Sequence, residues 1–227
     1  GDIAREFGLW LHVDAAYGGP AAIVPELRHH FSGWEQADSI VVNPHKWLFT
    51  PIDCSVLYCR RPGELRRAFS IVPEYLTSAE RGPVRNLMDY GVSLGRRFRA
   101  LKLWFVLRHF GRAGLIAEIR RHVALAHDFE RRLAEAEGWE VVAPVPLGTI
   151  AYRFSPGWDD PEAEDAANRR IMERVNASGA AFLSHTQLGE RTVLRLAIGN
   201  LKTTDEHVAA AWAALRAAGA AEMGAAD

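Results

Sequence analysis

The stretch His12-Val13-Asp14-Ala15-Ala16-Tyr17-Gly18-Gly19 decides how this sequence is read, because it joins an apolar run to a polar, glycine-rich segment. The apolar run is Leu9 to Val13. A second apolar run, Ser39 to Val42, leads directly into Asn43-Pro44-His45-Lys46-Trp47. The 25 residues between the two runs contain a predicted helix. This order predicts two parallel strands joined by a crossover, with a possible third strand at Ser55 to Cys59. We therefore expect an α/β fold.

Each of the first two predicted strands ends in a side chain that can do chemistry. Ligands of open α/β sheets bind beyond the carboxyl ends of the strands, so Asp14 and Lys46 are expected to face one crevice. Lys46 follows an apolar strand and precedes Trp47, so we expect its amine to be partly desolvated and able to form a Schiff base. Asp14 fits the acidic partner that pyridoxal-phosphate sites place at the pyridinium nitrogen. The small side chains of Ala15 and Ala16 would let a flat ring lie close to the strand end.

At this point the sequence resembles a known family. HVDAAYGG and NPHKW, with 32 residues from Asp14 to Lys46, resemble the paired signatures of the group II pyridoxal-phosphate decarboxylases. Pro73-Glu74-Tyr75-Leu76 and the segment from Leu94 to Trp104 resemble the branch that acts on aromatic amino acids. A weaker resemblance extends to Val193–Ile198, so it covers nearly the whole chain. It implies an aspartate-aminotransferase-like fold (fold type I), a homodimer with shared active sites, and decarboxylation of an aromatic L-amino acid substrate.

The resemblance also implies roles for individual residues. Lys46 would carry the cofactor, Asp14 would face its pyridine nitrogen, Asn43 would contact its phosphate, and His45 would lie beside cofactor or substrate. Tyr75, 29 residues after Lys46, would be the proton donor of a catalytic loop. The predicted cofactor-binding residues are Asp14, Ala16, Asn43, His45 and Lys46. The predicted catalytic residues are Lys46, Tyr75 and His45. Each residue also has a purely structural interpretation. Asp14 and Asn43 could be ordinary turn residues, His45 a packed core histidine, and Tyr75 a loop aromatic that covers apolar surface.

The chain is expected to form two domains. Residues 1–111 would be the carboxyl-terminal part of the cofactor-binding large domain, with the catalytic loop at about 74–90 and a linking helix at Phe98–Phe110. Residues 112–227 would be a small α+β domain. Its expected elements are a helix marked by Leu115 to Leu133, strands at Glu140–Ala143 and Thr149–Phe154, a helix at Glu162–Ala177, strands at Ala181–Ser184 and Val193–Ile198, and a last helix with a capping box of Thr203 and Glu206.

Several other functions are disfavoured. A net charge of −1 gives no electrostatic case for a nucleic-acid or membrane-surface partner, and the two cysteines do not form a disulfide framework. We expect a cytoplasmic protein without a metal. Gly91-Val92-Ser93-Leu94-Gly95 matches the nucleophile elbow of serine hydrolases but is not preceded by a predicted strand. His122 and His127 are expected on solvated helix faces. Arg195 is a weaker site candidate, because an arginine on a strand usually just pairs with a carboxylate.

The amino-terminal end of the sequence leads to two expectations, one about the extent of the chain and one about its activity. The chain opens with a short helical segment, Gly1 to Gly8, and passes at once into an apolar strand, so we expect upstream residues to be missing. The resemblance places the ring-stacking residue and most phosphate contacts upstream, so the chain alone is expected to bind pyridoxal phosphate poorly and to be inactive. Two alternatives remain open: a related pyridoxal-phosphate reaction (an aldehyde synthase or an aminotransferase), and an inactive truncated dimerisation module.

Overall fold

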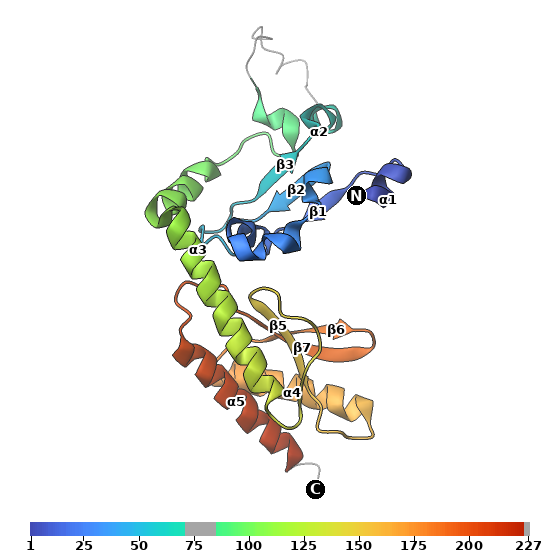
Figure 1. Cartoon of the computed structure of the whole chain (residues 1–227), viewed down its shortest axis with the longest axis vertical. Coiled ribbons are helices and arrows are strands. Elements are labelled where there is room, and N and C mark those ends of the chain that lie inside the picture. The colour runs from blue at the N-terminus through green and yellow to red at the C-terminus, as the bar shows by residue number, and fades with distance from the viewer. Residues whose placement is uncertain (71–84, 225–227) are drawn as a thin grey trace. The chain divides into compact units, whose positions relative to one another are not determined.

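A computed structural model describes residues 1–70 and 85–224 (Figure 1). The chain divides into two compact units, Gly1–Gly111 and Arg112–Asp227. Each unit has its own sheet. Within the described residues, none of the helices combines the length and apolar character that a membrane span needs.

The first unit is built on a three-stranded sheet in the order β1-β2-β3. Its strands are β1 (His12–Asp14), β2 (Ser39–Val42) and β3 (Val56–Cys59). The pair β1 and β2 is parallel, with Val13 opposite Ile40, whereas β3 runs antiparallel to β2. The predicted parallel pair and the third strand are thus confirmed, although β1 begins three residues later than the apolar run Leu9 to Val13.

The crossover between β1 and β2 differs from the prediction. Three short 3-10 helices, Gly19–Ile23, Pro25–Phe31 and Trp34–Gln36, take the place of the expected helix. Pro25 lacks the N–H that an α-helix through this point would need. The first 3-10 helix packs closely on β2: a Cβ added to Gly19 would meet Val42 Cγ2 at 2.8 Å.

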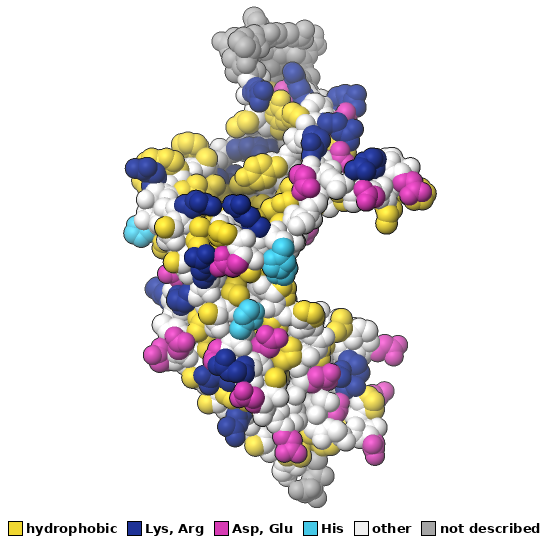
Figure 2. Space-filling model, viewed as in Figure 1, with side chains coloured by type: hydrophobic (Ala, Val, Ile, Leu, Met, Phe, Trp, Pro, Cys, Tyr) yellow, Lys and Arg dark blue, Asp and Glu magenta, His cyan; other side chains and the backbone are white. Residues whose placement is uncertain are grey.

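In the described part of the first unit, the remaining helices before α3 are short. They are α1 (Asp2–Glu6), α2 (Pro62–Phe69) and a 3-10 turn at Leu87–Tyr90. The long helix α3 (Arg99–Ala134) is interrupted at Gly111, whose φ of 60° and ψ of 175° are not helical. The sequence predicts two successive helices here, and the break falls between them. Figure 2 shows hydrophobic side chains at the surface over the start of α3, where Trp104 and Phe105 are exposed.

The second unit holds a four-stranded antiparallel sheet in the order β4-β5-β7-β6. Its strands are β4 (Trp139–Val141), β5 (Thr149–Phe154), β6 (Ser184–Leu188) and β7 (Arg191–Ala197). Its helices are α4 (Pro161–Ser178) and α5 (Asp205–Met223), together with the second part of α3 (Figure 1). Two boundaries were predicted wrongly: the strand expected at Ala181–Ser184 lies at Ser184–Leu188, and the capping box is formed by Thr204 and His207.

The core of the second unit follows from the alternation in β5. Ile150, Tyr152 and Phe154 are buried, and the residues between them are only half-buried. Phe129 of α3 packs edge-on against Tyr152, with ring centroids 5.5 Å apart. His122 is also fully buried, and its Nε2 lies 3.1 Å from the carbonyl of Asn200. The expectation of a solvated His122 is therefore wrong, whereas His127 is exposed.

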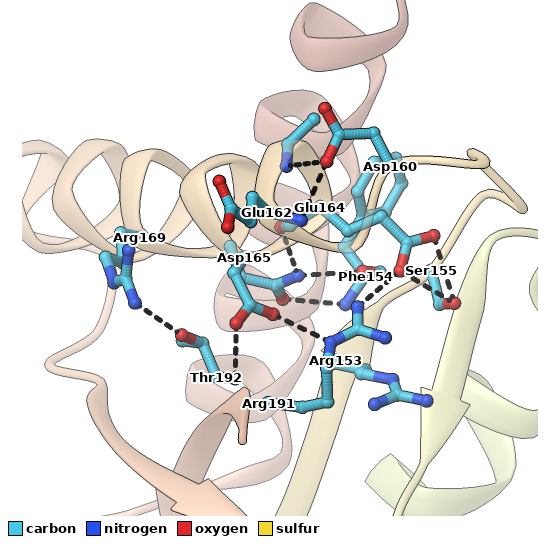
Figure 3. Close-up of polar contacts among 12 residues, drawn as sticks. Arg153, Phe154, Ser155, Asp160, Glu162, Glu164, Asp165, Arg169, Arg191 and Thr192 are labelled. Atoms are coloured by element: carbon cyan, nitrogen blue, oxygen red, sulfur yellow. Dashed lines mark hydrogen bonds and ion pairs between the residues drawn. The ribbon is translucent and has the colours of Figure 1, made fainter.

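Polar contacts attach α4 to the sheet (Figure 3). Arg191 Nη2 donates to Glu164 over 2.6 Å, and Arg191 Nε donates to Asp165 over 3.1 Å. The carboxamide of Asn168 bonds both main-chain groups of Phe154 at 2.8 Å. The side chains of Glu164, Asp165 and Asn168 are all buried, so their hydrogen bonds fix the position of α4 along the sheet.

Candidate active site

Backbone pairing brings the two polar segments of the first unit to one edge of its sheet. Asp14 lies opposite Val41 at the end of the parallel pair. Beyond this register pair, the N–H of Ala15 bonds the carbonyl of Val41 at 3.0 Å, and the N–H of Asn43 bonds the carbonyl of Ala16 at 3.0 Å. The segment that follows β1 and the segment that follows β2 are therefore joined directly by backbone hydrogen bonds.

Asp14 has one of its two carboxylate oxygens hydrogen-bonded at this edge. Its Oδ1 accepts a 3.0 Å hydrogen bond from the N–H of Ala16, and the side chain is exposed. Among residues 1–70 and 85–224, no donor is assigned to its second oxygen. Ala15 is buried and Ala16 half-buried, so no bulky side chain stands beside the carboxylate on its own segment. Asp14 can thus accept a further proton or hydrogen bond from a ligand.

Asn43 and His45 are both held by the segment that precedes β3. Ser55 Oγ donates to Asn43 Oδ1 over 2.6 Å. The Nδ1 atom of His45 lies 3.1 Å from the main-chain nitrogen of Cys54 and 2.7 Å from its carbonyl oxygen. His45 Nδ1 is therefore occupied by the main chain, and Nε2 is the ring nitrogen left for a ligand.

Lys46 lies in a tight turn and points to solvent. Its N–H bonds the carbonyl of Asn43 at 2.9 Å, and its side chain is exposed. The next residue, Trp47, turns inward: it is fully buried and stacks on Tyr17 at a centroid distance of 5.0 Å. Lys46 is thus exposed while Trp47 is buried, and the partial desolvation that the sequence predicts for Lys46 is not seen in this chain.

The sequence offers three further candidates for functional residues or motifs, and each must be considered separately. Tyr75, with the segment Pro73-Glu74-Tyr75-Leu76, lies outside the described residues. Arg195 belongs to β7 of the second unit, where it is exposed and has no assigned carboxylate partner among the described residues. The segment Gly91 to Gly95 is preceded by the 3-10 turn Leu87–Tyr90 and not by a strand, so it lacks the strand–turn–helix setting of a nucleophile elbow.

Two contributors to the site were missed by sequence reasoning, Cys54 and Ser55. They act across a turn on Asn43 and His45, and no periodic pattern reveals such a contact. Asp53, which precedes them, pairs with Arg99 Nε at 2.9 Å and so ties this segment to the start of α3. Within the described residues, no cluster of three or more metal-ligating side chains occurs.

Comparison with known proteins identifies the family. Residues 1–155 match the model of the pyridoxal-dependent decarboxylase conserved domain, and the chain belongs to this family. It is 41% identical to tryptophan decarboxylase TDC2 of Camptotheca acuminata over 95% of the chain, and 42% identical to tyrosine decarboxylase 4 of Petroselinum crispum over 95%. It is also 42% identical to phenylacetaldehyde synthase of Arabidopsis thaliana over 93%. The chain spans 44% of the length of each of these relatives.

Solved structures agree with this assignment. The Oryza sativa TDC structure with PLP and tryptamine superimposes with a TM-score of 0.89 at 42% identity, over 97% of this chain and 46% of that one. The structure of Rhodiola rosea 4-hydroxyphenylacetaldehyde synthase gives 0.84 at 37% identity, over 97% and 45%. These neighbours confirm the predicted α/β fold of the aspartate-aminotransferase type, with part of the large-domain sheet followed by a smaller α+β unit.

Proposed function

We propose that this protein takes part in pyridoxal-phosphate-dependent decarboxylation of an aromatic L-amino acid to the amine and carbon dioxide. The observation that carries the proposal is the parallel pairing of β1 and β2, because it places Asp14 and the Asn43–Lys46 segment at one sheet edge. Membership of the pyridoxal-dependent decarboxylase family and the identities to tryptophan and tyrosine decarboxylases support it.

The side chains present fit pyridoxal phosphate. Lys46 offers an accessible amine for a covalent bond to an aldehyde. Asp14 has a free carboxylate oxygen that can hold a proton on a pyridine nitrogen, and Asn43 has a free carboxamide NH₂ that can donate to a phosphate. When bound, the cofactor supplies an electron sink for the bond to the leaving carboxylate.

The chain's own residues supply binding and proton transfer. Lys46 fixes the position of the cofactor, Ala16 leaves room for a flat ring, and the Nε2 atom of His45 faces cofactor or substrate. Tyr75 gives a proton to the substrate Cα after carbon dioxide leaves; its role rests on the family resemblance. We also propose that the protein acts as a homodimer with shared active sites and works in the cytoplasm. An aromatic substrate is favoured because the named decarboxylase relatives act on tryptophan and tyrosine.

A second function from the same site is aldehyde synthesis. It is favoured by the identities to phenylacetaldehyde synthase and to 4-hydroxyphenylacetaldehyde synthase. Tyr75 argues for the amine, because the family resemblance implies that loss of this tyrosine diverts the reaction to aldehyde. Amino-group transfer and a purely structural dimerisation module are the remaining alternatives.

Product analysis separates these possibilities. The chain is assayed with tryptophan, tyrosine and phenylalanine, alone and together with the amino-terminal segment of the rice tryptophan decarboxylase. We expect amine and carbon dioxide in equal amounts from the combination, and Tyr75→Phe to shift the product towards aldehyde. Aldehyde and ammonia from the unsubstituted chain would favour the synthase. Absence of any product from the combination, when the rice enzyme itself is active, would contradict both.

A further inference from the structure

Asn43 is fixed from two sides. Its main-chain N–H bonds the carbonyl of Ala16 at 3.0 Å, and its side-chain Oδ1 accepts a 2.6 Å hydrogen bond from Ser55 Oγ. Ser55 lies immediately before β3, and the neighbouring Asp53 is anchored to Arg99. The backbone and the carboxamide of Asn43 are therefore held by different segments of the first unit.

The bond from Ser55 holds the carboxamide of Asn43 in place. A carboxamide has an acceptor oxygen on one side and a donor NH₂ group on the other. A serine hydroxyl can donate or accept, so the bond fixes the position of the group, and the hydroxyl serves as the donor when the NH₂ group has an acceptor of its own. In the described arrangement Oδ1 faces Ser55 and the NH₂ group lies on the other side, where no acceptor for it is assigned in residues 1–70 and 85–224.

We infer that Ser55 is a positioning residue for phosphate recognition. Its hydroxyl orients the Asn43 carboxamide so that the NH₂ group can donate to a phosphate oxygen of pyridoxal phosphate, a charge-assisted hydrogen bond. Ser55 acts through Asn43 and needs no contact with the cofactor. The inference rests on the proposed function, in which Lys46 and Asn43 bind that cofactor.

The test compares pyridoxal phosphate with pyridoxal, which has the same aldehyde and ring but no phosphate. The 227-residue chain is incubated with a concentration series of each compound and reduced with borohydride, and modification of Lys46 is quantified by peptide mass spectrometry. For Ser55→Ala we expect the half-saturating concentration of pyridoxal phosphate to rise by about two- to tenfold, the effect of one hydrogen bond. The value for pyridoxal should not change.

Further variants separate positioning from a general structural effect. Ser55 is exposed, so its truncation leaves no buried cavity. Ser55→Thr keeps a hydroxyl and should restore binding, and Ser32→Ala, at another exposed serine, should have no effect. In an Asn43→Ala background, Ser55→Ala should cause no additional loss, because the group that it orients is gone.

Each result has one meaning. A loss for pyridoxal phosphate alone supports the inference. Equal losses for both compounds, or no loss for either, would overturn it while leaving the proposed function in place. If Lys46 of the unsubstituted chain reacts with neither compound, even together with the amino-terminal segment of the rice tryptophan decarboxylase, the proposed function itself fails, and the inference fails with it.

Discussion

The main-chain N–H of Asn43 donates a 3.0 Å hydrogen bond to the main-chain carbonyl of Ala16. This bond lies beyond the last register pair, Asp14 with Val41, so the contact between the two strands continues into their polar extensions. The positions of Asp14 and Lys46 are consequently set mainly by backbone bonds, with one side-chain bond from the Ala16 N–H to Asp14 Oδ1. Asp14→Asn, which keeps the acceptor Oδ1, and substitutions of Lys46 are expected to leave this edge of the sheet intact, so their effects report on chemistry.

The close approach of Gly19 to β2 predicts a stability effect. In Gly19→Ala the new Cβ would lie 2.8 Å from Val42 Cγ2 and 3.1 Å from Ala15 Cβ. We expect the free energy of unfolding to fall by about 1–3 kcal/mol, as for other overpacked sites. Chemical denaturation measures this change. Gly63→Ala is the matched control, because a Cβ at Gly63 in α2 meets nothing within 4 Å. Equal stability of the two variants would show that the packing on β2 is looser than described.

The hydroxyl of Tyr152 is buried without a hydrogen-bond partner in the described part of the chain. The same burial raises the pKa of Tyr152. Removing an unsatisfied buried hydroxyl should recover its desolvation cost, so Tyr152→Phe is expected to stabilise the protein by about 1–3 kcal/mol. Thermal unfolding measures the gain, with Tyr58→Phe at an exposed position as control. A lower melting temperature for Tyr152→Phe would mean that the hydroxyl has a partner after all.

Asp165 predicts a pH dependence of stability (Figure 3). Burial raises the pKa of Asp165, but hydrogen bonds from the Thr192 N–H and from Arg191 outweigh it and hold this pKa below its ordinary value. A carboxyl with a lowered folded pKa contributes stability above its unfolded pKa of about 3.9 and loses it as the pH falls through the folded value.

We therefore expect the unfolding free energy to drop below about pH 4, and to drop less steeply in Asp165→Asn. Denaturant unfolding between acidic and neutral pH, followed by tryptophan fluorescence, gives the two slopes. Asp159→Asn, at an exposed aspartate just before α4, should behave like the unsubstituted chain. Identical slopes for Asp165→Asn and the unsubstituted chain would refute the assignment.

Strand positions were predictable where the sequence carries a periodic signal, and the residues of the candidate site were proposed from its motifs. The strong alternation of Ile150, Tyr152 and Phe154 gave the bounds of β5, and the apolar run before Asn43 gave β2. β6 was misplaced because all five of its residues are exposed, so no apolar pattern marks it, while the buried Leu183 lies just before it.

Contacts between distant segments could not be predicted in this way. The burial of His122 depends on Asn200, 78 residues later in the chain. The hydrogen bond from Ser55 to Asn43 depends on how one turn folds back on itself. The exposure of Lys46 depends on where the neighbouring Trp47 packs. Such features follow from the three-dimensional packing and have no local sequence pattern.

The central claim is that Lys46 is the lysine that binds pyridoxal phosphate. The other lysines of the chain, Lys102 and Lys202, are internal controls, and Lys202 is exposed like Lys46. The direct measurement is borohydride reduction of the chain at limiting pyridoxal phosphate, followed by peptide mapping of the modified lysines. We predict that the modification is concentrated on Lys46 and that Lys46→Ala abolishes it without increasing the modification of Lys102 or Lys202. An even distribution over the three lysines, or persistence of the modification in Lys46→Ala, would contradict the account.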